Sequence, residues 1–103
     1  MSKSERDKGK SGEREVEAMI RRRDVHVLRE QDGRTQGADF LVERFMAIDA
    51  KRRNRVEILK WSREIEEKVD PSIVPVIAYR PDREPWRASL LLEDLLELAW
   101  EPR

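Results

Sequence analysis

Two short apolar stretches on either side of a charged pair constrain the fold of this chain most strongly. They are Ala38–Val42 and Phe45–Lys51, separated by Glu43–Arg44. Two strand-length stretches joined by two residues predict a β-hairpin. Side chains alternate between the faces of a strand, so Asp49 and Lys51 are expected on the same face. The residues predicted to share that face are Phe45, Ala47, Asp49 and Lys51, opposite Met46, Ile48 and Ala50.

Hydrophobic periodicity predicts the remaining elements. In chain order we expect a helix over 11–23 with Ser11 as N-cap, strands over 24–29, 38–42 and 45–51, a helix over 56–68, strands over 73–79 and 86–91, and a helix over 93–100. Residues 30–37 are expected to form a polar loop bounded by glycine. The sequence therefore predicts an α/β fold, a mixed sheet flanked by helices in the order α-β-β-β-α-β-β-α.

The length and composition fit a single small domain. The chain has 103 residues, of which 43% are charged, and its formal net charge is zero. We expect residues 1–10 to be a flexible basic leader and residues 11–103 to form one domain. The charge is uneven, because residues 1–23 hold 8 basic and 5 acidic side chains while residues 89–103 hold 1 and 4. A neutral total can therefore hide a basic face opposite an acidic one.

The lack of cysteine limits the metal sites that the chain can form, and the lack of apolar targeting segments indicates its compartment. Without cysteine, disulfides and thiolate metal sites are excluded. Any metal would be held by oxygen ligands or by His26, which favours Mg²⁺ or Mn²⁺. The sequence has no signal peptide and no apolar run of membrane-spanning length, so we expect a cytoplasmic protein with no membrane partner.

An acid-x-Lys triplet occurs twice, and its context separates the two copies. With this composition about one such triplet is expected by chance. Glu66–Lys68 falls in a predicted helix, where positions i and i+2 do not share a face, so it is expected to be a solvated surface. Asp49–Lys51 falls on a predicted strand, where burying a carboxylate and an ammonium costs several kcal/mol unless they pair or bind something. The alternative for this second copy is an exposed ion pair at a strand end.

Asp39 strengthens the functional interpretation of Asp49 and Lys51. In a hairpin turning at Glu43–Arg44, Asp39 would lie approximately opposite Asp49. Two carboxylates this close repel unless a cation lies between them, and a divalent metal resolves the conflict. Two acids and a lysine around a metal can hydrolyse phosphodiesters, with Lys51 stabilising the transition-state charge.

Three segments resemble the PD-(D/E)xK nuclease superfamily and, within it, archaeal-type Holliday-junction resolvases and related phage endonucleases. KGKSGER at residues 8–14 resembles the KGxxxER helix start of those resolvases. GADFL at residues 37–41 stands in the place of the PD motif, and IDAKRR at residues 48–53 in the place of the (D/E)xK strand. The chain departs from the pattern with alanine for the motif's proline and aspartate at the second acidic position.

The resemblance implies a restriction-endonuclease-like fold and a Mg²⁺-dependent DNA endonuclease. By it, Glu13, Asp39 and Asp49 are metal ligands and Lys51 is the catalytic lysine, with Glu17 as the alternative helix acid. It also implies a homodimer that resolves four-way DNA junctions. Two alternatives remain: a nuclease for other branched, flap or nicked DNA, and a non-catalytic DNA-binding protein on the same fold.

Basic residues near the predicted site are candidates for binding DNA phosphates, although solvation of a charged surface explains several of them equally well. The predicted DNA-binding residues are Lys8, Lys10, Arg14, Arg34, Thr35, Arg52, Arg53 and Arg55. His26 is expected to be a structural or surface residue rather than a ligand or base. Trp61, Trp86 and Trp100 are expected to pack in the core or a dimer rather than to stack on bases.

Overall fold

The computed structural model describes residues 3–29 and 38–100, so Arg34 and Thr35 lie outside the described residues. The elements are α1 (Lys3–Arg21), β1 (Val27–Arg29), β2 (Phe40–Val42), β3 (Met46–Lys51), α2 (Ile58–Lys68), β4 (Val74–Tyr79), β5 (Arg87–Ser89) and α3 (Leu92–Trp100). Their order, α-β-β-β-α-β-β-α, confirms the predicted α/β architecture.

The strands form one mixed sheet in the order β1-β2-β3-β4-β5. β3 and β4 are parallel, because α2 crosses over between them, and the other neighbours are antiparallel. The predicted hairpin is confirmed: Glu43 and Arg44 have φ values of 51° and 66°, as a two-residue primed turn requires. The turn fixes the β2–β3 register, in which Phe40 pairs with Ile48.

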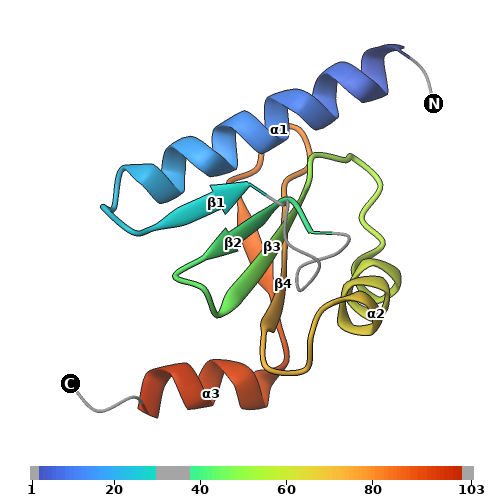
Figure 1. The fold of residues 1–103 in the computed structure, drawn as a ribbon. Coiled ribbons are helices and arrows are strands. Elements are labelled where there is room, and N and C mark those ends of the chain that lie inside the picture. The colour runs from blue at the N-terminus through green and yellow to red at the C-terminus, as the bar shows by residue number, and fades with distance from the viewer. Residues whose placement is uncertain (1–2, 30–37, 101–103) are drawn as a thin grey trace.

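A helix covers each face of the sheet, so the core has two parts (Figure 1). On one face Ala47 and Ile77 pack against Trp61 and Ile65 of α2. On the other face Val16 of α1 packs in a cluster whose buried centre is the fully enclosed Phe40. The predicted alternation along β3 is confirmed, since Ala47 faces α2 while Met46, Ile48 and Ala50 face α1.

The first helix differs from the prediction at its start. It begins at Lys3, so residues 3–10 are helical rather than a flexible leader, and Ser11 lies inside the helix instead of capping it. Lysine, glutamate and arginine, which dominate this segment, are good helix formers even where no apolar face is present. The helix also ends two residues early, at Arg21, and Asp24 then adopts a positive φ of 55°.

Gly12 lets α1 lie close to the end of β3. It is buried, and a Cβ atom placed there would lie 2.7 Å from Cβ of Arg52. A side chain at this position would therefore push the helix off the sheet.

Among the helices of the described ranges, none has both the length and the apolar character that a membrane span requires.

Candidate active site

Asp39 lies directly before β2 and is tied to β3 by two hydrogen bonds. Its amide donates to the carbonyl of Ile48 at 2.9 Å, which continues the ladder and sets Asp39 opposite Asp49. Its Oδ2 accepts a hydrogen bond of 2.8 Å from the amide of Ala50. The structure therefore brings together the two acids that the hairpin predicted to be neighbours.

Asp49 and Lys51 lie side by side at the end of β3. Nζ of Lys51 is 2.9 Å from Oδ2 of Asp49, and the side chains are 23% and 12% exposed respectively. Both point to the α2 face, where Nζ lies 6.0 Å from the ring centre of Trp61. Trp61 is buried in the core, so it packs under the lysine rather than offering a surface for base stacking.

Glu13 of α1 reaches the same group of carboxylates. Burial, a hydrogen bond with Glu13 and the negative charge of Asp49, in that order, raise the pKa of Asp39 to about 8. Glu17, the alternative helix acid, is instead ion-paired at 2.8 Å with Arg21 one turn further along. The geometry therefore favours Glu13 as the acid that joins Asp39 and Asp49.

The donor set suits a hard divalent cation, because Glu13, Asp39 and Asp49 all supply carboxylate oxygen. No three acidic or histidine side chains of the described residues already stand in a metal-binding arrangement. Asp49 is paired with Lys51, and Asp39 is engaged by Ala50 and Glu13. A cation would therefore replace the contacts of Lys51 with Asp49 and of Glu13 with Asp39.

A basic cavity of about 540 Å³ opens beside Lys51. Its basic lining residues are Lys8, Lys51, Arg52, Arg53, Arg55 and Lys60. Four of the predicted phosphate-binding residues therefore line one cavity, and Lys60 of α2 joins them unpredicted. Lys10 and Arg14 are exposed on α1 and are not among the lining residues.

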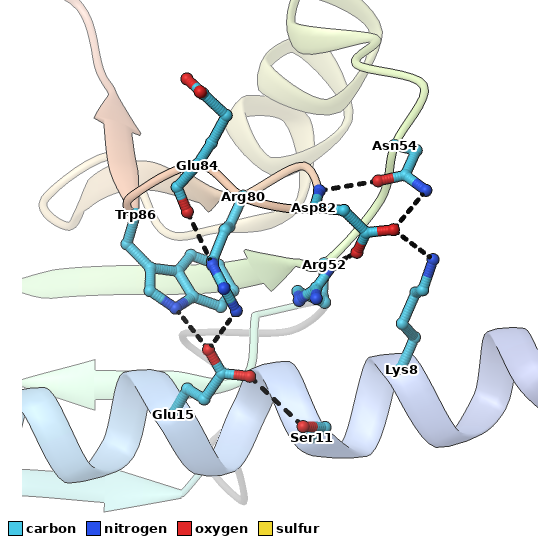
Figure 2. A network of polar contacts seen from close by, with 9 residues as sticks. All are labelled: Lys8, Ser11, Glu15, Arg52, Asn54, Arg80, Asp82, Glu84 and Trp86. Carbon is cyan, nitrogen blue, oxygen red and sulfur yellow. Dashed lines mark hydrogen bonds and ion pairs between the residues drawn. The ribbon is translucent and has the colours of Figure 1, made fainter.

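Asp82, in the turn between β4 and β5, gathers the polar groups at one edge of this cavity (Figure 2). It is ion-paired with Nη1 of Arg52 at 2.5 Å and with Nζ of Lys8 at 3.4 Å. Asn54 donates to its carboxylate at 2.8 Å and accepts from its amide at 2.7 Å. Hydrogen bonds from Asn54 and Arg52 hold the pKa of Asp82 well below its usual range. The Arg52 side chain, only 14% exposed, is thus fixed by its ion pair with Asp82 rather than free in solvent.

A second polar cluster ties α1 to the end of β4 (Figure 2). Oε1 of Glu15 accepts hydrogen bonds from Arg80 at 2.7 Å and from the indole of Trp86 at 3.1 Å. Ser11 donates to the other oxygen of Glu15 at 3.3 Å. Because Glu13 lies on the helix between Lys8 and Glu15, these two clusters determine where Glu13 is placed.

His26 lies away from these groups. It is exposed, and its amide donates at 2.7 Å to Glu43 in the β2–β3 turn, at the opposite end of β3 from Lys51. This exposed position, away from the acids, agrees with a structural or surface residue rather than a ligand or base.

A solved structure with a similar fold identifies the architecture of the chain. Hjc of Archaeoglobus fulgidus, a Holliday junction resolvase from an archaeal hyperthermophile, matches with a TM-score of 0.56 over 81% of this chain and 72% of the resolvase, at 15% identity. The chain has the fold of this resolvase. The expected restriction-endonuclease-like architecture is thereby confirmed, while 15% identity leaves activity to be argued from the site. No protein-family model and no curated protein sequence matches the chain.

Proposed function

We propose that this protein is a metal-dependent endonuclease that hydrolyses DNA phosphodiester bonds. The observation that carries the proposal is the meeting of Asp39, directly before β2, with Asp49 on the adjacent strand β3, with Lys51 beside them and a basic cavity next to the lysine. A protein that only binds DNA gains nothing from carboxylates placed where phosphates must approach, because like charges repel. Those carboxylates therefore favour a nuclease over a non-catalytic binder.

The three carboxylates and the lysine of the site each have a proposed role. Glu13, Asp39 and Asp49 would hold Mg²⁺, or Mn²⁺ in its place. When bound, such an ion polarises a phosphoryl oxygen and lowers the pKa of a coordinated water. Lys51 now pairs with Asp49 and is positioned by Trp61, so its ammonium can donate to a phosphate oxygen as negative charge develops there.

The basic cavity would hold the DNA backbone on either side of the reacting phosphate. Arg53, Arg55 and Lys60 line it, and the Arg55 side chain is 90% exposed, so it can reach a phosphate without first leaving a buried partner. These contacts bind backbone and carry no sequence information. They therefore favour recognition of DNA structure over recognition of a base sequence.

We further propose a four-way junction as the substrate and a homodimer as the active species. The fold shared with a Holliday junction resolvase supports this choice. Two sites related by a two-fold axis suit a substrate of the same symmetry. Flap, nicked or otherwise branched DNA is the alternative substrate for the same chemistry.

Mg²⁺-dependent cleavage of a labelled four-way junction, compared with a matched linear duplex, tests the proposal. Lys51→Ala should lower the cleavage rate by about 100-fold or more, as the loss of one transition-state contact does. Asp49→Asn should lower the rate at least as much, because it removes a carboxylate that would hold the metal. The chain supplies its own controls: Glu66→Gln and Lys68→Ala alter the second acid-x-Lys triplet on exposed α2 positions and should leave the rate unchanged.

The outcomes separate the candidate functions. Junction cleavage that both site variants abolish supports the resolvase. Cleavage of flap, nicked or otherwise branched DNA, but not of four-way junctions, would support the nuclease and replace the proposed substrate. DNA binding without cleavage, indifferent to metal and to both variants, would leave a binding protein.

A further inference from the structure

The last helix turns its apolar side away from the protein. At 100° per residue, Leu92, Leu95, Leu96 and Trp100 fall on one side of α3. Leu92 is 67% exposed, Leu96 58% and Trp100 82%. The structure describes all of Leu92–Trp100, and none of these side chains is buried. Among the residues that the structure describes, an amphipathic helix in this orientation has no apolar partner that would stabilise it.

An apolar groove of about 330 Å³ lies elsewhere on the molecule, between the C-terminal half of α1 and β5. Its lining is mostly aliphatic and aromatic, including Met19, Ile20, Ile48, Ala78, Trp86 and Ala88. Arg23 of α1 and Arg87 of β5 add positive charge to this lining. The groove therefore offers an apolar surface of the kind that could cover the leucine side of α3.

Charge selects the groove over a second α3 as the partner of this helix. Glu93 and Glu97 flank the leucine side of α3 next to Trp100, while Asp94 lies on the opposite side of the helix. Antiparallel pairing of two copies of the helix about a two-fold axis would therefore bring the like charges of these two flanks together. Arg23 and Arg87 are of the opposite sign. Arg87 is ion-paired with Glu84 at 3.1 Å, but both side chains are about half exposed, so this pair is weak and easily exchanged.

The position of α3 favours the groove of another copy over its own. Only Leu90 and Leu91 separate β5 from α3, and the helix starts at once, because the amides of Asp94 and Leu95 both donate to the carbonyl of Leu91. Leu91 and Asp94 share a cavity with Pro71 and Ile73, which precede β4. α3 thus starts beside the beginning of β4, and it lies on the opposite side of the strands from α1 (Figure 1).

We propose that α3 of each protomer packs into the α1–β5 groove of a second copy, reciprocally about a two-fold axis. A contact that uses two different patches closes into a dimer when each copy gives one patch and receives the other. The interface rests on neither Asp49 nor Lys51, and it supplies surfaces for the homodimer on which the proposed function relies. Oligomeric state measured without DNA or metal therefore tests the interface separately from the nuclease chemistry.

Sedimentation equilibrium of the full chain gives the first test. The wild type should be a dimer, and both Leu96→Glu on the helix and Ala88→Glu in the groove should raise its dissociation constant by at least about 30-fold, as loss of a central interface residue does. Leu59→Glu is the matched control, because Leu59 of α2 is also an exposed leucine, at 67%, outside both surfaces. A monomeric wild type, or a dimer that tolerates Leu96→Glu, would overturn the proposal.

Disulfide trapping gives the second test, and the absence of cysteine makes it clean. Protein carrying Leu96→Cys, mixed with protein carrying Ala88→Cys, should form a covalent dimer of one copy of each. Dimers within the Leu96→Cys protein alone would show pairing of two α3 helices instead. An intramolecular bond in the doubly substituted chain, with no cross-linking between chains, would place α3 on its own groove. Either of these last results would refute the exchange.

Discussion

The amide of Ala50 donates a 2.8 Å hydrogen bond to Oδ2 of Asp39, so the residue between Asp49 and Lys51 orients the acid of the neighbouring strand. One backbone contact thus links the two parts of the candidate site. It also fixes one oxygen of Asp39 in a place where Glu13 and Asp49 both bring further carboxylate groups. The crowding has measurable consequences.

The stability of the metal-free protein should fall as pH rises from about 4 to about 8. Burial, Glu13 and Asp49 raise the pKa of Asp39 from 3.8 to about 8, so the folded state holds a proton that the unfolded chain releases. The stabilisation is complete below the unfolded pKa and is lost as pH rises through the folded value. Melting temperatures measured with chelator across this range should decline for the wild type relative to Asp39→Asn. Parallel profiles of the two proteins would contradict the shift.

Glu13→Gln should weaken Mn²⁺ binding by at least about tenfold, because it removes a carboxylate that contacts Asp39. Glu17→Gln is the matched control on the same helix and should have little effect, since Glu17 is ion-paired with Arg21. Isothermal titration calorimetry measures both. A larger effect at Glu17 would exchange the assignments of the two acids.

Asp82→Asn should lower the proposed cleavage activity while changing the melting temperature little. The substitution removes the charge that holds Arg52 and Lys8, which line the basic cavity. Glu84→Gln serves as the control, because Glu84 lies in the same turn but pairs with Arg87. Tighter DNA binding by Asp82→Asn, with cleavage unchanged, would instead mean that Asp82 competes with phosphate for these cations.

Two glycines of α1 should respond in opposite ways to alanine. At Gly9 a Cβ would meet no heavy atom of the described residues within 4 Å apart from its own stretch of helix, so Gly9→Ala should stabilise the helix by up to about 1 kcal/mol. At Gly12 the added atom would lie 2.7 Å from Cβ of Arg52, so Gly12→Ala should cost about 1–3 kcal/mol. Urea unfolding measures both changes. Equal stabilisation by the two substitutions would show that α1 can shift away from Arg52 without cost.

Local pattern was enough to predict the hairpin and the common face of Asp49 and Lys51, because both follow from the two-residue repeat of a strand. The start of α1 at Lys3 was not predicted, because the first turns of the helix have no apolar stripe that would indicate a helix. Glu13 was expected only through the resemblance of its segment to resolvases, as periodicity alone does not show which acid reaches Asp39.

The contacts of Asp82 and Glu15 had no signal in the sequence. They join residues up to 74 positions apart, and charged residues are too common in this chain for any one pair to stand out. Similarly, the sequence predicted a last helix over 93–100 but not that its leucines would face solvent. Both features depend on the packing of whole elements.

The link between Glu15 and Arg80 also orders events during synthesis of the chain. The two residues are 65 positions apart, and Trp86, which binds the same carboxylate, comes later still. α1 can form as soon as it leaves the ribosome, but the contacts of Glu15 with Arg80 and Trp86 cannot form until the β4–β5 turn has followed it. Closing loops of this length is slow compared with forming a helix. The two hydrogen bonds that tie α1 to the β4–β5 turn are therefore complete only near the end of folding, and a growing chain passes through most of its synthesis without them.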